Sequence, residues 1–516
     1  MKNLLRNIFT HKKHRSFIHA DEVFMDSQNI PGFNINQMQG VIERSIPLQT
    51  FHVVRYIVCI VGIIFIVRLF YLQILQGDSY RTRAENNRLD SIPVFAERGV
   101  IYDRNLTPLA WNQQSGDGGF LMRKYISNGG FSHVVGYVRY PERDSSGNLW
   151  RSETVGEAGI EKALNTDLAG VNGKQYLERD VSGTVTSENL GEPAQQGENI
   201  VLSIDERVQS ELYKAISEQA TSLGFVGGAG AIMDIHTGEL IALTSFPEYN
   251  NEVMSEGTDK KAIYDYKMSP RKPFINRAVS GMYTPGSIVK TFIGIAGLEE
   301  GIITPQTTVY SSGKITVPNK YDPSKPQIFR DWKPGGHGTV NIYTAIAESV
   351  NTYFYAIGGG YGSQTGLGID RINQYMEKFG LDEKIPFILP GIKTGTVPSI
   401  DWKKQKFKDG TWRVGDTYNT SIGQFGFQLG VLPVLRGVAS IANNGTLVDP
   451  VLIKNAQSKT RTVAGVDTVH YSVMREAMRT TVTRGTGQAM NVPFVSVAAK
   501  SGTAQVGPNR RYMNSW

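Results

Sequence analysis

The sequence contains a single cysteine, Cys59, among its 516 residues. An intrachain disulfide is therefore excluded. Because Cys59 lies inside an apolar stretch, we interpret it as a packing or lipid-facing residue and not as a reactive thiol. Internal repeats and low-complexity tracts are also absent, so the chain reads as ordinary globular sequence of two or more domains.

The chain also lacks a strong excess of charge of either sign. Its formal net charge is +7, and residues 1–76, with eight Lys/Arg and four Asp/Glu, hold +4 of it. The remaining 440 residues carry only +3, and no basic block of binding size occurs among them. This balance excludes a typical nucleic-acid-binding protein.

The longest apolar run covers residues 53–75 and reads VVRYIVCIVGIIFIVRLFYLQIL. It has about the ~20 residues that a bilayer core requires. Arg55 and Arg68 lie near its two ends, where a long side chain can reach the interface. Before it, five Lys/Arg precede the first acidic residue, Asp21. We predict a cytoplasmic tail over residues 1–52, an uncleaved membrane anchor over 53–75, and export of the rest.

A candidate nucleophile occurs in Ser287-Ile288-Val289-Lys290. Serine and lysine three apart lie on one face of a helix, so the amine can reach the hydroxyl proton. The run that follows, through Leu298, is apolar nearly all round and predicts a buried helix. Lys290 can act as a base only when it is neutral, so its pKa must fall from the reference value of about 10.4 towards neutrality. Burial acts in that direction, and so would a second cation in the same cleft.

Two further elements follow in order: Ser349-Val350-Asn351, and Lys500-Ser501-Gly502-Thr503. Residues 492–499 before Lys500 are rich in β-branched and apolar residues and predict a strand that lines the site. A better match by letters, Lys393-Thr394-Gly395, lies between prolines and predicts a loop. We therefore choose Lys500.

Other look-alikes are rejected on local grounds. Ser269-x-x-Lys272 contains Pro270, which disfavours a helix, and Ser311-x-x-Lys314 reads as a turn. His236 beside Asp234 suggests a Ser-His-Asp triad, but the segment is better interpreted as a hairpin turn.

The three elements in this order, behind one membrane anchor, resemble the penicillin-recognising acyl transferases. Within them, Arg98-Gly99-Val100-Ile101-Tyr102-Asp103-Arg104-Asn105 resembles the pedestal of class B penicillin-binding proteins. Residues 159–162, 202–205, 233–239 and 276–278 agree with that class, and the resemblance covers roughly residues 53–516. Residues 390–398, followed by 401–403, and residues 415–424 resemble the elongation (rod-shape) branch more than the division branch. Asn351 departs from that branch, which often has aspartate there.

The resemblance implies an α/β (α+β) fold with a β-rich pedestal over residues 76–200 and a transpeptidase domain over 201–516. That domain is expected to be three-layered, an antiparallel sheet with helices on both faces. The implied activity is peptidoglycan D,D-transpeptidation in cell-wall synthesis and cell-shape maintenance, with covalent binding of penicillin. Stem peptides and β-lactams are the implied ligands. A polytopic glycosyltransferase of the shape, elongation, division and sporulation family is the implied partner, contacted through the anchor and pedestal.

The resemblance also implies roles for individual residues. Ser287 attacks the D-alanyl-D-alanine carbonyl, Lys290 is its base, Ser349 relays the proton, and Asn351 binds the substrate amide and helps fix Lys290. Lys500 stays charged and holds the terminal carboxylate with Ser501 and Thr503, beside Gly502. The oxyanion hole is expected from the backbone N–H groups of Ser287 and Ala504, and Gln424 lies on a loop bordering the site.

No cofactor is expected, and no metal either. Some family members hold zinc with cysteine, histidine and aspartates, and Asp331 and His337 are present here, but no cysteine is available.

Among rival functions, a secreted β-lactamase lacks support because no Glu-x-x-Leu-Asn follows Asn351. A bifunctional class A protein would need more than residues 76–200 before the catalytic domain. A membrane-anchored penicillin sensor or non-catalytic scaffold stays open and is distinguished by whether D-alanine release turns over.

The end of the sequence carries one more expectation. Residues 507–510 read as a turn, and Asn514-Ser515-Trp516 as the beginning of a returning strand. We expect the transpeptidase domain to be C-terminally incomplete, with all proposed catalytic residues present.

Overall fold

The computed structural model describes residues 48–80, 89–114, 120–145, 149–179, 185–319, 322–506 and 512–516. The chain divides into two compact units, residues 1–88 and residues 89–516. Most of the predicted cytoplasmic tail, residues 1–47, lies outside the described residues.

The first unit contains helix α1 (Leu48–Phe70), which continues into a π-helical turn, η4 (Tyr71–Leu75). Apart from polar residues in its first two turns and Arg68 near its end, its side chains are apolar around the whole circumference. Residues Thr50–Leu75 form the one helix, among those the structure describes, that is long and apolar enough to cross a membrane. The helix predicted over residues 53–75 is therefore confirmed.

The N-terminal part of the second unit is built from β-sheets. Strands β1 (Leu89–Val94), β9 (Gly173–Arg179) and β10 (Val185–Glu192) form one antiparallel sheet in the order β1-β9-β10. A second sheet has the order β11-β2-β3-β4, with strands β2 (Ile101–Tyr102), β3 (Pro108–Gln114), β4 (Leu121–Tyr125) and β11 (Ile200–Val201). Small strand pairs and short helices complete this region: β5 (Val138–Arg139) with β8 (Val155–Gly156), β6 (Glu142–Arg143) with β7 (Leu149–Arg151), α3 (Ser132–Val135), α4 (Gly159–Ala163) and α5 (Asn165–Ala169).

Residues that carried the pedestal resemblance meet in the interior of this region. Glu161 accepts hydrogen bonds from Arg98 Nε at 2.5 Å and from Arg123 Nε at 2.7 Å, and all three side chains are buried. Asp103 Oδ2 accepts from the backbone N–H of Glu206 at 3.1 Å, which ties the pedestal to the next helix. These motif residues therefore serve the architecture of the pedestal.

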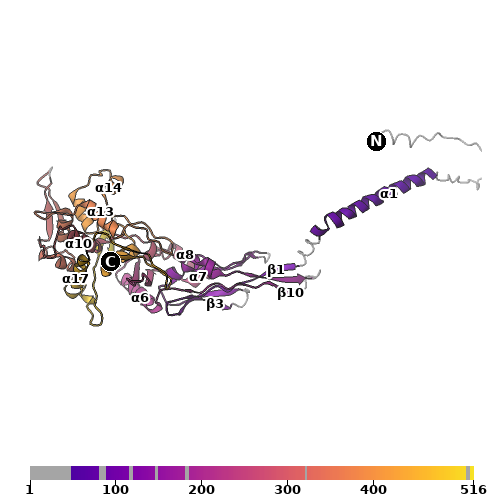
Figure 1. Cartoon of the computed structure of the whole chain (residues 1–516), viewed down its shortest axis with the longest axis horizontal. Helices are drawn as coiled ribbons and strands as arrows, with labels where there is room; N and C mark the ends of the chain where they lie inside the picture. The colour runs from indigo at the N-terminus through magenta and orange to yellow at the C-terminus, as the bar shows by residue number, and fades with distance from the viewer. Residues whose placement is uncertain are drawn as a thin grey trace, which may run out of the picture. The chain divides into compact units, whose positions relative to one another are not determined.

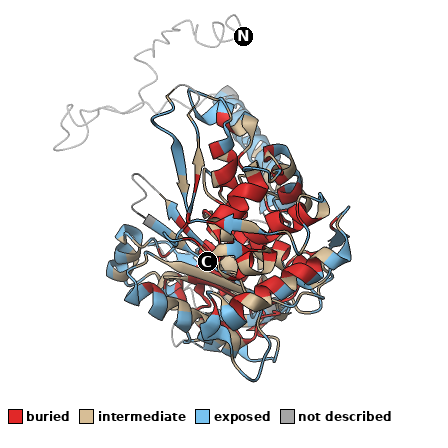
Figure 2. Ribbon diagram, turned by 90° about the vertical axis from the view of Figure 1, so that its left-hand side faces the viewer, coloured by how far each residue is buried: buried red, intermediate tan, exposed pale blue. Residues whose placement is uncertain are grey.

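The remaining part of the second unit is mainly helical, and its core surrounds helix α10 (Lys290–Glu299). Every residue of α10 from Lys290 to Leu298 is buried, as the apolar run predicted. Helices α12 (Asn351–Gly359), α13 (Ile369–Lys378) and α17 (Thr468–Arg484) pack against it. Figure 1 shows α10, α13 and α17 gathered at the end of this unit away from β1 and β10, and Figure 2 shows the buried residues concentrated in the helices.

The strand pair β12 (Gly228–Met233) and β13 (Leu240–Phe246) has helices on both faces. Helix α6 (Glu206–Ser222) packs so closely that a Cβ at Gly228 or Gly230 would lie 2.5 or 2.7 Å from Ile216. Side chains alternate along a strand, so Ala229 and Ala231 face the opposite side, where they pack in the core with Ala278 of α9 (Arg277–Ser280) and Leu432 of α16 (Val431–Ala442). Glycine and alanine in β12 thus allow two helical layers to approach the backbone.

The β12–β13 turn confirms the interpretation of His236. Asp234 Oδ1 accepts from the backbone N–H of His236 at 2.8 Å and of Thr237 at 3.1 Å, which closes a turn. His236 is therefore part of a hairpin connection.

Strands β20 (Thr503–Val506) and β21 (Tyr512–Ser515) form a separate antiparallel pair. Asn514 and Ser515 lie in the returning strand, as expected, whereas the predicted turn over residues 507–510 lies outside the described residues. Within the described residues, β12–β13 and β20–β21 are two ladders and not one continuous sheet.

The strand predicted over residues 492–499 is wrong. This segment has no partner strand in the described chain and includes a turn, and β20 begins only at Thr503. Helix α17 holds the segment instead: Arg479 Nη1 donates to the Val497 carbonyl at 2.7 Å, and Ala499 N–H donates to the Met478 carbonyl at 3.0 Å. High β-propensity without a neighbouring edge did not produce a strand.

A second core joins the pedestal to the helical region. It includes Ile101 and Leu109 from the pedestal together with Leu240, Leu389 and Leu432. The predicted domain boundary at residues 200/201 stays a prediction, because both sides belong to one compact unit. The other elements of the helical region are α7 (Asn251–Glu256), α8 (Lys260–Met268), η5 (Gly286–Val289), β14 (Val309–Ser311), β15 (Lys314–Val317), β16 (Gln327–Arg330), β17 (Gly338–Val340), α11 (Ile342–Ala347), α14 (Ile400–Lys406), α15 (Val414–Ser421), β18 (Thr446–Val448), β19 (Thr460–Thr462) and η6 (Gln488–Met490).

Candidate active site

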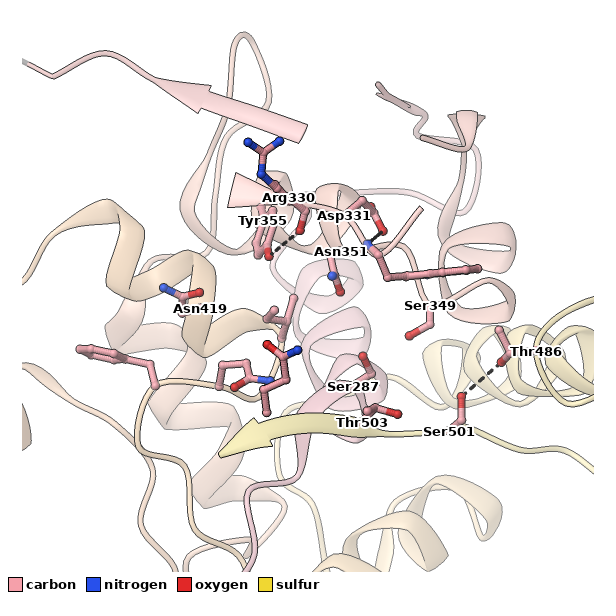
Figure 3. A pocket seen from close by; sticks show the side chains of 15 residues that line it. Ser287, Arg330, Asp331, Ser349, Asn351, Tyr355, Asn419, Thr486, Ser501 and Thr503 are labelled. Atoms are coloured by element: carbon pink, nitrogen blue, oxygen red, sulfur yellow. Dashed lines mark hydrogen bonds between the residues drawn. The ribbon is translucent and has the colours of Figure 1, made fainter. Parts of the chain in front are cut away.

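A cleft of about 790 Å³ opens beside the N-terminal end of α10 (Figure 3). It brings together segments that are far apart in the sequence, including the three predicted elements. Its lining residues are Ser287, Arg330, Asp331, Trp332, Ser349, Asn351, Tyr355, Asn419, Ile422, Gln424, Phe425, Thr486, Ser501, Thr503 and Gln505.

Ser287 lies in the 3₁₀ turn η5, immediately before α10, and is partly exposed to the cleft. The turn is crowded by its neighbours: a Cβ on Gly286 would lie 2.6 Å from the Thr503 carbonyl oxygen. Gly286 also has a φ of +57°, a left-handed conformation that favours glycine. The absence of a side chain here lets strand β20 approach the proposed nucleophile.

Lys290 is fully buried one turn further on. Its Nζ donates to the Ser349 carbonyl at 2.8 Å, to Ser349 Oγ at 3.3 Å and to Asn351 Oδ1 at 2.7 Å. Burial, and secondarily the charge of Lys500, hold the pKa of Lys290 well below its usual value, while Asp331 acts in the opposite direction. The direction of this pKa shift is the one that the sequence required.

The expected hydrogen bond between Lys290 and Ser287 is not formed among the described residues. The amine is directed towards Ser349 and Asn351 instead. Catalytic hydrogen bonds are often long before substrate binds. The buried Lys290 amine therefore lies one turn from Ser287, and its hydrogen bonds are with Ser349 and Asn351 of the Ser349-Val350-Asn351 element.

Ser349 connects the two lysines. Its Oγ lies 3.3 Å from Lys290 Nζ and 3.0 Å from Lys500 Nζ. A hydroxyl can donate to one amine while it accepts from the other. This geometry gives a continuous path for a proton between Lys290 and the cleft.

Lys500 differs from the expectation that it stays charged. Burial lowers its pKa to about 7, which acts against the charged form in the free site. Its Nζ also donates to the Ser501 carbonyl at 2.7 Å. An anionic ligand next to the amine would raise this pKa again.

The side chains of Ser501, Thr503 and Gln505 alternate along the chain and face the cleft. Ser501 Oγ lies 3.2 Å from Thr486 Oγ1, and Figure 3 shows Thr503 beside Ser287. Gly502 brings the strand close to the turn, since a Cβ there would lie 2.7 Å from the Pro285 carbonyl oxygen.

The expected oxyanion donor Ala504 is directed away from the cleft. Gly502 and Trp516 exchange both backbone hydrogen bonds, at 3.1 and 2.8 Å. Hydrogen-bonded and non-hydrogen-bonded pairs alternate in an antiparallel ladder, so the next hydrogen-bonded pair is Ala504 with Asn514. The N–H of Ala504 therefore points to β21, and that of Thr503 points outward to the Ser287 side. The register corrects the assignment from Ala504 to Thr503.

Residues 415–424 border the cleft, as expected, but they form helix α15 and the turn after it instead of a loop, and they contribute Asn419, Ile422 and Gln424 to its lining. The turn is held against η5 because Gly286 N–H donates to the Gly423 carbonyl at 3.1 Å. Gln424 therefore lies where it can contact a bound peptide.

The look-alike motifs are outside this cleft. Lys393 is exposed in an irregular segment, as its proline neighbours predicted. Ser269 follows α8 in an extended conformation. Ser311 is fully buried in β14, and its Oγ lies 2.7 Å from Thr352 Oγ1, which places it behind the Ser349 segment.

Sequence reasoning missed several lining residues: Arg330, Trp332, Tyr355 and Phe425. They come from strand β16, the loop after it, helix α12 and the segment after α15, and only the fold brings them together. Asp331 and His337 were considered only as potential zinc ligands.

A zinc ion does not fit this pair. Asp331 Oδ2 already accepts two hydrogen bonds from Thr352, and the His337 Nε2 faces Asp331 Oδ1 at 3.5 Å. Structural zinc sites use four ligands, commonly with cysteine. In the described chain, no group of three or more His, Cys, Asp or Glu is arranged to hold a metal.

Comparisons with known proteins agree with the geometry. Residues 228–516 match the penicillin binding protein transpeptidase domain, and residues 121–202 match the penicillin-binding protein dimerisation domain.

Two curated relatives and one solved structure are similar over most of the chain. A peptidoglycan D,D-transpeptidase MrdA of Escherichia coli is 26% identical, covering 88% of this chain and 84% of its own. The MrdA of Acinetobacter baumannii is 32% identical over 75% of this chain and 57% of its own. The penicillin-binding protein PBP2 of Helicobacter pylori, solved in complex with MreC, superposes with a TM-score of 0.66 at 26% identity, covering 81% of this chain and 90% of that one.

Proposed function

The chain belongs to the class B penicillin-binding proteins, as a peptidoglycan D,D-transpeptidase of the rod-shape elongation branch, and we propose that Ser287, Lys290, Ser349, Asn351 and Lys500 carry out its reaction. The observation that carries this assignment is the arrangement beside Ser287: a fully buried lysine and a second lysine share one serine hydroxyl. No carboxylate is hydrogen-bonded to either amine in the described part of the chain. Burial in such a cluster favours a neutral Lys290, which the serine nucleophile needs as its base.

In acylation, Ser287 Oγ attacks the carbonyl carbon of the penultimate D-alanine of a stem peptide. Lys290, in its neutral form, takes the hydroxyl proton. The tetrahedral oxyanion is stabilised by the backbone N–H groups of Ser287 and Thr503. When the peptide bond breaks, the proton passes through Ser349 Oγ to the nitrogen of the departing D-alanine, which leaves an ester on Ser287.

In the second step, an amine of a neighbouring stem peptide attacks this ester carbonyl. The amine loses a proton through the same Ser349–Lys290 path, and Ser287 Oγ regains a proton as the new amide bond forms. Atoms and charges balance without a cofactor. Asn351 Oδ1 holds the Lys290 amine at 2.7 Å throughout, while its amide nitrogen is available to the peptide.

Lys500 binds the terminal carboxylate of the donor peptide, together with the hydroxyls of Ser501 and Thr503. The pKa of Lys500 is about 7 in the free site, and the bound carboxylate raises it by stabilising the protonated amine. Gln424 lies on the opposite loop and contacts the peptide backbone.

The test is release of D-alanine from a pentapeptide substrate, measured per enzyme over time. The proposed roles predict many turnovers for the wild-type chain and none for Ser287→Ala. A single release equal to the enzyme concentration would favour the penicillin-sensor alternative and contradict the transpeptidase roles.

We also propose the setting of this reaction. Helix α1 is a single-pass anchor by its length and composition. The basic residues that precede it favour a cytoplasmic N-terminus and a catalytic unit on the outer side of the plasma membrane. The H. pylori PBP2 structure contains MreC, which supports an elongation-type assembly here. We propose that this chain also has a partner that polymerises glycan strands. This partner is a polytopic glycosyltransferase of the shape, elongation, division and sporulation family, and the chain contacts it through the anchor and the pedestal.

A further inference from the structure

Ser349 has an unusual backbone. Its φ is +56°, in the left-handed region that residues with a side chain rarely adopt. Such a conformation persists only where the surrounding structure holds it. The hydroxyl would leave its place between Lys290 and Lys500 if Ser349 relaxed.

A single loop, residues 331–337 between β16 and β17, contacts the chain on both sides of Ser349. On the side after Ser349, Asp331 Oδ2 accepts from Thr352 N–H and from Thr352 Oγ1, both at 2.9 Å. On the side before it, Trp332 Nε1 donates to the Glu348 carbonyl at 3.0 Å. This loop therefore holds the two flanks of the strained residue.

His337 completes the hold on Glu348. Its Nδ1 lies 2.6 Å from Glu348 Oε2, and its side chain is fully buried. The rings of Trp332 and His337 meet edge to face at a centroid distance of 5.4 Å. The other ring nitrogen, Nε2, makes no hydrogen bond among the described residues. The connection from His337 to the Ser349 segment thus runs through Nδ1.

We propose that His337 is a positioning residue for transpeptidation, which acts through Glu348 to keep the Ser349 hydroxyl between Lys290 and Lys500. The proposal rests on the role of Ser349 as proton relay. In this proposal, the contact between the His337 imidazole and the Glu348 carboxylate supports the Ser349 segment. Asp331 and His337 supply two donors there, which are too few to hold a zinc ion.

The two ring nitrogens allow a sharp test. Asparagine places its amide nitrogen near the position of Nδ1, whereas glutamine places it near that of Nε2. His337→Asn should therefore retain acylation by a fluorescent penicillin within about threefold of wild type, and His337→Gln should slow it at least about tenfold. His470→Ala is the matched control, because His470 makes a similar contact with Glu299 at 2.9 Å, outside the cleft lining.

The measurement separates the initial non-covalent affinity for the penicillin from the rate of acylation at saturation. A positioning role predicts that His337→Gln lowers the saturating rate with little change in affinity, at an unchanged melting temperature. Equal acylation rates in His337→Gln and wild type would overturn the proposal, as would equal losses in the asparagine and glutamine variants.

Two further readouts separate this proposal from its premises. Ser349→Ala, measured in parallel, should also slow acylation; if it does not, the relay role itself is wrong and the positioning proposal is overturned with it. Purified full-length protein is also assayed for zinc. One zinc per chain, with acylation lost on chelation, would replace the imidazole–carboxylate account with a metal site.

Discussion

The pedestal and the cleft each contain a buried polar cluster, and their charges are balanced differently. In the pedestal, Glu161 lies between Arg98 and Arg123 at 2.5 and 2.7 Å, so a carboxylate faces each guanidinium. In the cleft, Lys290 and Lys500 converge on Ser349 Oγ, and in the described residues no carboxylate is hydrogen-bonded to either amine. Both clusters join segments that are distant in the sequence.

The difference in charge balance separates structure from chemistry. Charge-assisted hydrogen bonds from the two arginines to the Glu161 carboxylate fix the geometry of the pedestal. Burial lowers the pKa of both Lys290 and Lys500, and the charge of Lys500 lowers the pKa of Lys290 further. The pedestal cluster is therefore expected to affect stability when it is altered, and the cleft cluster to affect the reaction.

The largest effect is expected at Ser287. Ser287→Ala should abolish covalent labelling by a fluorescent penicillin, since the acyl bond forms at that oxygen. Ser269→Ala is the matched control and should label like wild type, because Ser269 lies outside the cleft. Ser311→Ala is a poorer control, because Ser311 Oγ bonds Thr352 behind the Ser349 segment. Labelling that survives Ser287→Ala would show that the acylated residue is not Ser287.

The next effect is expected at the base. Lys290→Arg should slow acylation by about 10² to 10⁴, nearly as much as Lys290→Ala, because arginine cannot give up its proton in a protein. Lys403→Arg is the control: Lys403 is also buried, but its Nζ lies 2.6 Å from Asp416 Oδ2 and needs only its charge. Stopped-flow acylation measures both variants. An arginine at position 290 that acylates within about tenfold of wild type would leave Lys290 a purely electrostatic role.

A smaller effect is expected from the substrate-binding lysine. Lys500→Ala should lower the second-order rate constant of acylation by about 30- to 1,000-fold, because the carboxylate of the penicillin loses its buried partner. Lys393→Ala should change it less than about twofold, although Lys393-Thr394-Gly395 matches the motif better, because that segment is an exposed loop. If the two results were exchanged, the wrong segment would have been placed in the site.

The pH dependence tests the two lysines together. Lys290 must be neutral, so acylation should be lost as pH falls through its lowered pKa. Lys500 must be protonated, so the second-order rate constant should fall as pH rises above about 7. Lys500→Arg should remove this alkaline decline, since arginine stays charged. A decline that persists in Lys500→Arg would assign it to another group.

The smallest effect on the reaction is expected in the pedestal. Glu161→Gln should lower the free energy of unfolding by about 3 to 5 kcal/mol, because two buried guanidinium groups lose their carboxylate. The folded fraction should still acylate at the wild-type rate. Denaturant unfolding and active-site titration with penicillin measure the two quantities on one sample. A normal stability with impaired acylation would reverse the contrast between the two clusters.

The sequence predicted the apolar helix α1 and the buried helix α10 because each depends on local pattern, whereas the three elements that meet in the cleft were identified through a family resemblance. The apolar run after Ser287 predicted a helix buried on all sides, and α10 has that burial. The prolines around Lys393 predicted a loop. These features follow from neighbours in the chain, which a sequence displays directly.

Features that depend on distant partners were not predictable. Residues 492–499 have strand propensity but pack on α17 through Arg479, and no strand in the part of the chain that the structure describes pairs with them. The N–H direction of Ala504 depends on its register with Asn514, which the sequence does not contain. His337 and Trp332 support Ser349 only because a loop between β16 and β17 folds over that segment.

The central claim is that Ser287 is the residue acylated in this cleft, and peptide mapping after penicillin labelling tests it most directly. Full-length protein is labelled, digested and analysed by mass spectrometry for the peptide that carries the penicilloyl group. The account predicts one modified peptide, with the ester on Ser287. Modification of any other serine, with Ser287 unmodified, would contradict it.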